Sequence, residues 1–335
     1  MSNWTVVGFE GTRSTPRDWS IERDILDTVG ATLVTALCDS EQEAAEALRY
    51  ADVGLAHTHP VTGLPVLDIS STCRALILGG VGHEHVDIAG ATERGIAVAN
   101  VPDYCVEEVT DHALALLFAL ARGLMPLNAS TRRGEWNHRA GGELMQIAGR
   151  QLGLYGFGRI ARRLAEKASA IGIAVLAFDP YVDPSVMKNL SVKPAENLAH
   201  LLSSSDFVSL HTHETPETEK SINADSIQLM KPGSLLINVS RGGLIDEVSL
   251  FEALRSGYLN GAALDVMAVE PFDMSSPLFS LENLIVTPHS AWYSEQAGQE
   301  LSRLMAHAAI QALQGKLPDN TINAKEKPYF WWLDS

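Results

Sequence analysis

The sequence has few cysteines and no long apolar run, and each shortage argues against a class of protein. Its three cysteines, Cys38, Cys73 and Cys105, lie far apart without C-x-x-C spacing. A sparse, odd set of this kind is typical of a reducing compartment and argues against a disulfide framework. The first residues contain no basic segment followed by an apolar stretch, so we expect no signal peptide and a cytoplasmic location.

Positive charge is also scarce. Lys and Arg number 25 against 41 Asp and Glu, which gives a net charge of −16. This balance disfavours nucleic acid or an anionic membrane as a direct partner. The longest apolar helical candidate, residues 113–121, is too short to span a bilayer. With 335 residues, the chain is long enough for two domains that each bury a core.

The most informative stretch, residues 151–180, has the pattern of a strand, a glycine turn, a helix and a second strand. Gly156, Gly158 and Ala161 fit G-x-G-x-x-G/A, and Asp179 stands 21 residues after Gly158. In a dinucleotide-binding unit the glycines permit a tight turn and close approach of a pyrophosphate, and the small third residue lets the helix pack on the strand. A carboxylate at Asp179 would bind ribose hydroxyls and repel a 2′-phosphate, and residues 180–184 contain no Arg. The stretch therefore predicts NAD as the cofactor rather than NADP.

Apolar runs alternate with helical stretches along the whole chain. This alternation predicts an α/β protein with two Rossmann- or flavodoxin-like doubly wound parallel sheets. We expect strands at 4–9, 31–37, 53–56, 74–78, 152–155, 173–178, 207–210, 235–238, 262–264 and 284–286, and long helices at 106–122 and 296–314. The register of the last helix suits packing on the first domain. We therefore predict a substrate domain of residues 1–102 completed by 290–335, an NAD-binding domain of residues 103–289, and a cleft between them.

Polar residues follow the last three expected strands. Arg241 follows the strand at 235–238, Asp265 and Glu270 follow the next, and His289 follows the last. Because ligands of doubly wound sheets bind beyond the carboxyl ends of the strands, these side chains are expected at one edge. A histidine can exchange a proton near neutral pH, and a neighbouring carboxylate favours the imidazolium and raises its pKa. Each residue alone has a structural interpretation, but together they favour a catalytic set.

Several segments, in order, resemble the D-isomer-specific 2-hydroxyacid dehydrogenases: 79–87, 93–102, the glycine turn at 156–160, 238–247, 263–271 and 287–292. Residues 290–297 look like the branch that contains the C-terminal-binding proteins, which are NAD-binding corepressors. The resemblance implies reversible oxidation of a D-2-hydroxy acid to its 2-keto acid. It implies that Arg241 holds the substrate, that His289 is the acid/base and that Glu270 is its partner. It also implies a homodimer formed through the helix at 106–122.

The resemblance further implies two sets of binding residues. The NAD set consists of Gly156, Gly158, Arg159, Ile160, Asp179, Thr212, His213, Thr218, Val239, Ser240, Arg241 and Asp265. The substrate set consists of Gly80, Val81, Gly82, Arg241, His289 and Trp292. The chain departs from the family pattern at Glu84 and His85 and at His57 and His59, so the identity of the 2-hydroxy acid stays open.

Other interpretations compete at several places. Three His-x-His pairs, at 57/59, 83/85 and 211/213, invite a metal site, but none has a Cys or carboxylate at familiar metal spacing, so no metal is expected. Trp292 either walls the substrate pocket or packs internally, and the aromatic residues 329–332 are interpreted as a docked surface strap. Two alternative functions are an NAD(H)-sensing, corepressor-like binding protein with slow dehydrogenase activity and a dehydrogenase of a non-carboxylate anion such as phosphite.

Overall fold

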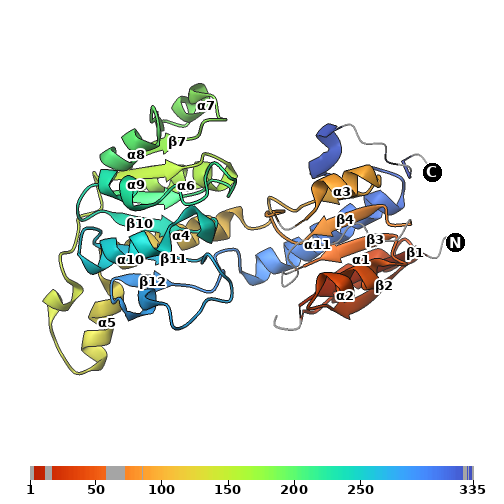
Figure 1. Ribbon diagram of the computed structural model, residues 1–335, viewed down its shortest axis with the longest axis horizontal. Helices are drawn as coiled ribbons and strands as arrows, with labels where there is room; N and C mark the ends of the chain where they lie inside the picture. Colours follow the sequence, from red (N-terminus) through yellow and green to blue (C-terminus); the bar gives the residue numbers. More distant parts are fainter. Residues whose placement is uncertain are drawn as a thin grey trace. The chain divides into compact units, whose positions relative to one another are not determined.

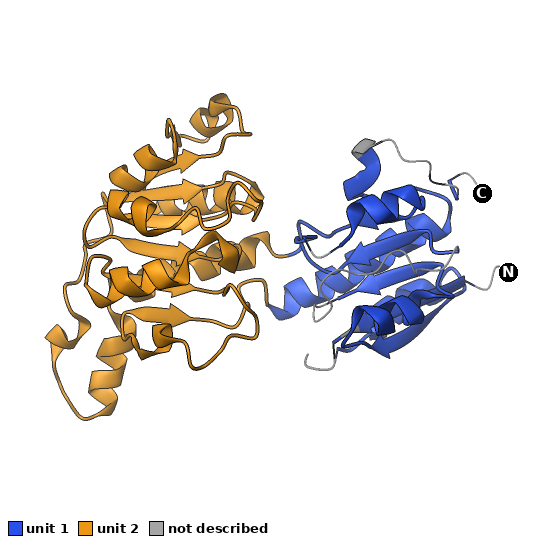
Figure 2. Cartoon of the chain, in the orientation of Figure 1, with its two compact units in different colours: residues 1–104, 294–335 blue, residues 105–293 orange. Residues whose placement is uncertain are grey.

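The computed structural model describes residues 4–11, 17–57, 72–84, 86–326, 330 and 332–333. The chain divides into two compact units, residues 1–104 with 294–335 (unit 1) and residues 105–293 (unit 2), which Figure 2 shows in two colours. The sequence placed the boundaries a few residues earlier, at 102/103 and 289/290. The substrate role of unit 1 and a cleft between the units stay predictions.

In the described part of unit 1, five strands form a parallel sheet in the order β2-β1-β3-β4-β5 (Figure 1). Its strands are β1 (Trp4–Glu10), β2 (Ala31–Leu37), β3 (Val53–Ala56), β4 (Ala75–Leu78) and β5 (Ala97–Ala99). Its helices are α1 (Ser20–Asp27), α2 (Glu41–Leu48), α3 (Ile88–Glu93) and α11 (Glu295–Leu313). This is the flavodoxin-like strand order. The short α3 and β5 were not predicted as elements.

Successive residues of the unit 1 strands point to opposite faces of the sheet. In β1, Val6 packs in the cluster that contains residues of α1 and α11, whereas Val7 packs with residues of α2 on the other face. Both faces are therefore covered by helices. At the N-terminus of α11, the Ser294 hydroxyl accepts a hydrogen bond from the Ala297 N–H at 2.9 Å, which caps the helix.

The two described aromatic residues near the C-terminus lie in this core. Phe330 and Trp332 pack in the same cluster as α11, and Trp332 is fully buried. The Nε1–H of Trp332 donates to the carbonyl of Gly95 at 2.8 Å. The expectation of a surface strap is wrong for these two residues, because the indole finds both an apolar environment and a buried acceptor. Tyr329 and Trp331 lie outside the described residues.

Every residue of unit 2 is described, and its seven strands form a parallel sheet in the order β12-β11-β10-β9-β6-β7-β8. The strands are β6 (Gln151–Tyr155), β7 (Ala174–Phe178), β8 (Lys193–Pro194), β9 (Phe207–Leu210), β10 (Leu235–Asn238), β11 (Gly261–Leu264) and β12 (Leu284–Val286). The helices are α4 (Val106–Ala121), α5 (Leu124–Arg132), α6 (Arg159–Ala170), α7 (Pro184–Asn189), α8 (Leu198–Ser204), α9 (Ala224–Leu229) and α10 (Glu247–Arg255). The order reverses between β6 and β9, as in a Rossmann fold. The prediction of two doubly wound parallel sheets is confirmed. Among the strands of unit 2, β8 was missed because its two residues form no apolar run.

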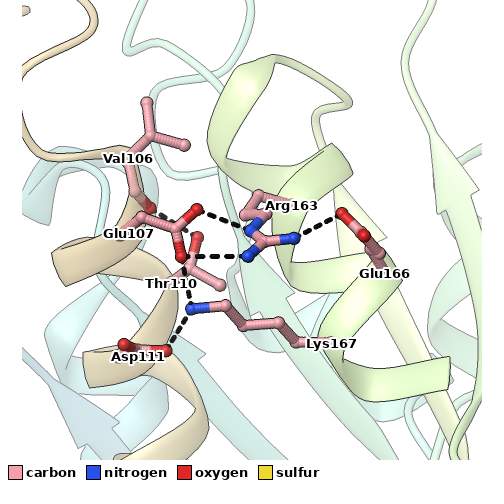
Figure 3. A network of polar contacts seen from close by, with 7 residues as sticks. All are labelled: Val106, Glu107, Thr110, Asp111, Arg163, Glu166 and Lys167. Carbon is pink, nitrogen blue, oxygen red and sulfur yellow. Dashed lines mark hydrogen bonds and ion pairs between the residues drawn. The ribbon is translucent and has the colours of Figure 1, made fainter. Parts of the chain in front are cut away.

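Helix α4 lies against the dinucleotide helix α6. Its apolar residues Leu116 and Leu117 are buried in the core that also holds Ala161 and Leu164 of α6. Figure 3 shows the polar rim of this contact, where Arg163 of α6 pairs with Glu107 of α4 at 2.6 Å. Lys167 pairs with Glu107 at 2.8 Å and also with Asp111. The first two turns of α4 are therefore fixed to α6 by both apolar and ionic contacts.

Helix α5 was not predicted, and it projects from the rest of unit 2 together with the loop that follows it (Figure 1). In the described residues, no single helix is long and apolar enough to cross a membrane. The pair α4 and α5, which is bent by 61° at the break, satisfies the length and hydropathy criteria jointly. The apolar residues of this pair include Leu116 and Leu117 of α4, which are buried inside unit 2.

Candidate active site

Apart from the short β8, the unit 2 strands end level with one another, and their register brings the candidate residues to one edge. Tyr155 of β6 pairs with Phe178 of β7 and with Leu210 of β9. Along the sheet, Leu210 pairs with Asn238, which pairs with Leu264, which pairs with Val286. The next residues along the chain are Gly156, Asp179, His211, Val239, Asp265 and Thr287. This aligned edge is where doubly wound sheets bind their ligands.

The glycine turn fits a dinucleotide. Gly156 has φ +93°, and a Cβ at this position would lie 2.6 Å from backbone atoms of His211. Gly158 is the N-cap of α6 without a side-chain cap, and a Cβ there would meet no atom within 4 Å. The space beside Gly158 is therefore open at the start of α6, whose first-turn N–H groups include those of Arg159 and Ile160. A pyrophosphate could accept hydrogen bonds from these donors.

Asp179 is tied to this turn. Its Oδ2 accepts a hydrogen bond from the Phe157 N–H at 2.8 Å, and its Oδ1 accepts one from the Tyr181 N–H at 2.9 Å. Each carboxylate oxygen has a second lone pair for a further donor. The carboxylate is thus fixed beside the turn, at the end of β7 where a ribose would lie in such a fold.

The loops after β9 and β10 are joined by hydrogen bonds. The Ser240 hydroxyl donates to the carbonyl of Thr212. Thr218 donates its hydroxyl hydrogen to the carbonyl of His213 at 2.7 Å. Val239 is partly buried next to Ser240. The predicted NAD residues of these two loops are therefore neighbours in the structure.

Arg241 lies in a short turn within the segment 238–247 that the sequence analysis singled out. The side-chain amide of buried Asn238 donates to the Arg241 carbonyl at 2.7 Å, and its oxygen accepts from the Ser240 N–H at 3.0 Å. Gly242 follows, and a Cβ there would lie 2.0 Å from the backbone of Met267. Only glycine permits this approach, which sets Arg241 against the loop that carries Glu270.

Glu270 and His289 form a direct pair. Nδ1 of His289 lies 2.7 Å from Oε2 of Glu270, and the Met267 N–H donates to Oε1 at 3.0 Å. Burial alone would raise the pKa of Glu270. The hydrogen bond and charge of His289, the Met267 N–H and the charge of Arg241 outweigh burial and lower this pKa. The structure therefore brings Arg241, Glu270 and His289 together, as the sequence predicted from their places after three strands.

Asp265 is buried at the centre of the same edge. Its Oδ1 accepts hydrogen bonds from the Thr287 hydroxyl and, at 2.9 Å, from the Ser290 N–H. Its Oδ2 accepts from the Ala291 N–H at 2.9 Å. The carboxylate thus bonds to the Thr287 side chain before His289 and to backbone N–H groups after it. The sequence assigned Asp265 to NAD only and overlooked this contact with the 287–291 segment.

The remaining candidates lie elsewhere. Gly80, Val81 and Gly82 follow β4 in unit 1, where the carbonyl of Val81 accepts from the Asn100 side chain at 2.7 Å. Trp292 packs edge-on against Tyr293 with ring centroids 5.5 Å apart. These contacts do not test a substrate role. All three cysteines are buried, and none of them forms a disulfide.

The histidine pairs do not gather metal ligands in the described structure. His57 follows β3 and packs edge-on against Trp19, and burial, with a smaller contribution from Arg17, lowers its pKa to about 3. His59 and His85 lie outside the described residues. Across the described ranges, no group of three or more His, Cys, Asp or Glu could hold a metal ion.

Comparisons with known proteins assign the family. Residues 114–291 match the model of the D-isomer specific 2-hydroxyacid dehydrogenase family, NAD binding domain. A D-3-phosphoglycerate dehydrogenase of Methanocaldococcus jannaschii is 34% identical over 305 residues, which are 91% of this chain and 57% of that protein. The chain spans just over half the length of the curated relatives of this kind that it matches.

Two solved structures are similar over nearly the whole chain. A protein from Thermus thermophilus has 31% identity and a TM-score of 0.84, with 95% of this chain and 99% of that chain covered. An acyclic imino acid reductase in complex with NADPH and D-Arg has 26% identity and a TM-score of 0.83, with the same coverage. The aligned strand ends, the glycine turn and the matched domain lead to one conclusion: this chain belongs to the D-isomer specific 2-hydroxyacid dehydrogenase family.

Proposed function

We propose that the protein is an NAD-dependent dehydrogenase that interconverts a D-2-hydroxy acid and its 2-keto acid. The observation that carries this proposal is the hydrogen bond between His289 and Glu270 beside Arg241, at the sheet edge that also presents the dinucleotide turn. The bound nicotinamide supplies the hydride for reduction and accepts it in oxidation. The side chains of this edge then have to bind the acid and move one proton.

His289 is suited to move that proton. Because its Nδ1 faces Glu270, its Nε2 is the ring nitrogen available to the substrate oxygen. In oxidation Nε2 takes the hydroxyl proton, and in reduction it returns a proton to the carbonyl oxygen. The Glu270 carboxylate stabilises the charged ring that forms. Arg241 binds the carboxylate and polarises the carbonyl as negative charge grows on its oxygen.

The cofactor preference follows from Asp179. The family model that matches residues 114–291 is that of an NAD binding domain, whereas one similar structure is a complex with NADPH, so the fold alone does not decide the phosphate preference. The fixed carboxylate of Asp179 would repel a 2′-phosphate and accept hydrogen bonds from ribose hydroxyls. This supports NAD.

The substrate side involves unit 1. We propose that the backbone N–H groups of Gly80, Val81 and Gly82 bind the substrate carboxylate, that Trp292 contacts the substrate, and that unit 1 closes on unit 2 around it. Curated relatives are D-3-phosphoglycerate dehydrogenases by name, which makes a phosphorylated 2-hydroxy acid one candidate.

The deciding experiment is NADH oxidation against a panel of 2-keto acids: glyoxylate, hydroxypyruvate, 3-phosphohydroxypyruvate, pyruvate, 2-oxoglutarate and phenylpyruvate. Turnover of one or two supports the proposal and names the substrate class. Tight NADH binding without turnover of any acid would contradict it. That outcome would favour the alternative suggested by residues 290–297, an NAD(H)-sensing protein of the corepressor kind.

A further inference from the structure

His112 is a polar residue in the apolar helix α4, and its place in the sequence indicated no role. We propose that His112 is a positioning residue for the proposed reaction, acting on His289 through Thr287 and Asp265. This inference rests on the proposed function, because it concerns how the acid/base is held.

The direction of the hydrogen bonds can be derived. Nε2 of His112 lies 3.0 Å from Oγ1 of Thr287, and Thr287 donates to Oδ1 of Asp265 at 2.5 Å. A hydroxyl has one hydrogen, and an ionised carboxylate only accepts. The Thr287 hydroxyl must therefore donate its hydrogen to Asp265 and accept a hydrogen bond from the Nε2–H of His112. The Nε2 of His112 is also 3.6 Å from the same carboxylate oxygen.

This chain of contacts ends at the backbone of His289. The Asp265 carboxylate accepts from the N–H groups of Ser290 and Ala291, and the Asp265 carbonyl accepts from the N–H of His289 at 2.8 Å. His289 has φ +51°, in the left-handed region that residues other than glycine rarely adopt. Such a conformation persists when the surroundings over-determine it. The hydrogen bonds around Asp265 supply that constraint.

Helix α4, which carries His112, is held in place by contacts with α6 and the core. Glu107 and Asp111, on the turns next to His112, pair with Arg163 and Lys167 of α6 (Figure 3). On the other side, Ala113 is buried in the core. The His112 side chain is itself 24% exposed, so replacing it removes a donor without emptying a buried site. An effect of such a replacement on turnover would therefore report positioning rather than lost packing.

The test compares His112→Leu, which loses the donor, with His112→Gln, whose amide can reproduce it. We expect His112→Leu to lower kcat for reduction of the 2-keto acid about tenfold, as for the loss of one well-formed hydrogen bond. The Kd of NADH should change by less than about threefold, and His112→Gln should recover most of the loss. His307→Leu, which removes an exposed histidine of α11 in unit 1, is the matched control and should leave kcat unchanged.

Variants of Thr287 provide a second test of the same positioning role. Thr287→Val removes the hydroxyl that links His112 to Asp265, whereas Thr287→Ser keeps it. The double variant His112→Leu with Thr287→Val should be no slower than Thr287→Val alone, because both changes interrupt one chain. Additive losses, or a His112→Leu variant with reduced melting temperature and unchanged kcat, would overturn the positioning role.

A readout without turnover separates this inference from the proposed function. In the protein bound to NADH, with no keto acid, the ring ¹⁵N signals of His289 should shift in His112→Leu and return in His112→Gln. If the wild type reduces no keto acid, the proposed function fails while this comparison still decides the positioning. Unchanged His289 signals in His112→Leu would refute the positioning role of His112.

Discussion

Nδ1 of His289 lies 2.7 Å from Oε2 of Glu270, although 19 positions separate the two residues in the chain. The contact depends on β11 and β12 ending side by side, since the two residues follow these two strands. It leaves Nε2 of the imidazole for a substrate, and it places a carboxylate where a developing imidazolium needs one.

Removing the imidazole should stop the chemistry and spare cofactor binding. We expect His289→Asn to lower kcat by about 10²–10⁴-fold, which is the usual contribution of a positioned proton donor. Glu270→Gln should cause a smaller loss, because the imidazole remains but its charged form is less stabilised. Stopped-flow NADH oxidation measures both rates, and NADH fluorescence checks binding. Near wild-type chemistry in His289→Asn would rule out the acid/base role.

The carboxylate of Asp179 should set the cofactor preference. Asp179→Ala removes both the repulsion of a 2′-phosphate and the acceptor for ribose hydroxyls. We therefore expect the ratio of NADPH affinity to NADH affinity to rise in the variant. Titration of both cofactors by fluorescence gives this ratio. Tighter binding of NADPH than of NADH by the wild type would contradict the argument.

The C-terminal Trp332 should contribute strongly to the stability of unit 1. Its side chain is fully buried and its Nε1–H is bonded to Gly95. Replacing a buried Trp by Ala typically costs about 3–5 kcal/mol. Urea unfolding followed by circular dichroism should show this loss for Trp332→Ala. Tyr50→Ala, at a side chain that is 81% exposed in the same unit, should change the unfolding free energy by less than about 0.5 kcal/mol.

Lowering the pH should destabilise the fold through His211. Burial lowers the pKa of this imidazole to about 4, whereas an unfolded histidine titrates near 6.5. Between these values the unfolded chain binds a proton that the folded chain does not, so the free energy of unfolding falls as the pH decreases from about 6.5 to 4. Between pH 7 and pH 5 we expect a loss of about 2 kcal/mol from this residue.

Urea unfolding of the wild type and of His211→Gln at both pH values isolates this contribution from that of the carboxylates. The variant should lose less stability on acidification. Its Ser209 partner, which lies 2.8 Å from Nε2 of His211, can still bond to an amide. Equal losses in the two proteins would mean that His211 titrates normally in the fold.

The homodimer that the resemblance implies, formed through the helix at 106–122, should be extended by exposed apolar side chains in the projecting part of unit 2, which follows this helix. The side chains of Leu124, Met125 and Trp136 are 51%, 52% and 95% exposed there. Burial of such apolar surface against a second copy would stabilise an assembly. We expect Trp136→Asp to shift the protein towards the monomer in light scattering at micromolar concentration. A monomeric wild type would contradict the prediction.

The class of the fold and the grouping of the main candidate residues could be predicted from the order of the residues alone. Apolar runs bounded by polar residues located six of the seven unit 2 strands, because buried parallel strands require continuous apolar residues. Gly156, Gly158 and Asp179 were recognisable because a dinucleotide turn constrains backbone conformation and charge at fixed spacing. The place of Arg241, Glu270 and His289 after strands predicted a shared edge, since parallel strands align their carboxyl ends.

The contacts that hold this edge became visible only in the folded chain. The bond from His112 to Thr287 spans 175 positions and depends on how α4 lies on the sheet. The close approach at Gly242 and the burial of Trp332 against Gly95 likewise join distant segments. Such contacts leave no periodic signal in the sequence. A single polar residue in an apolar helix, or a single aromatic residue in a tail, has the same sequence neighbours whether or not it contacts a distant partner in the fold.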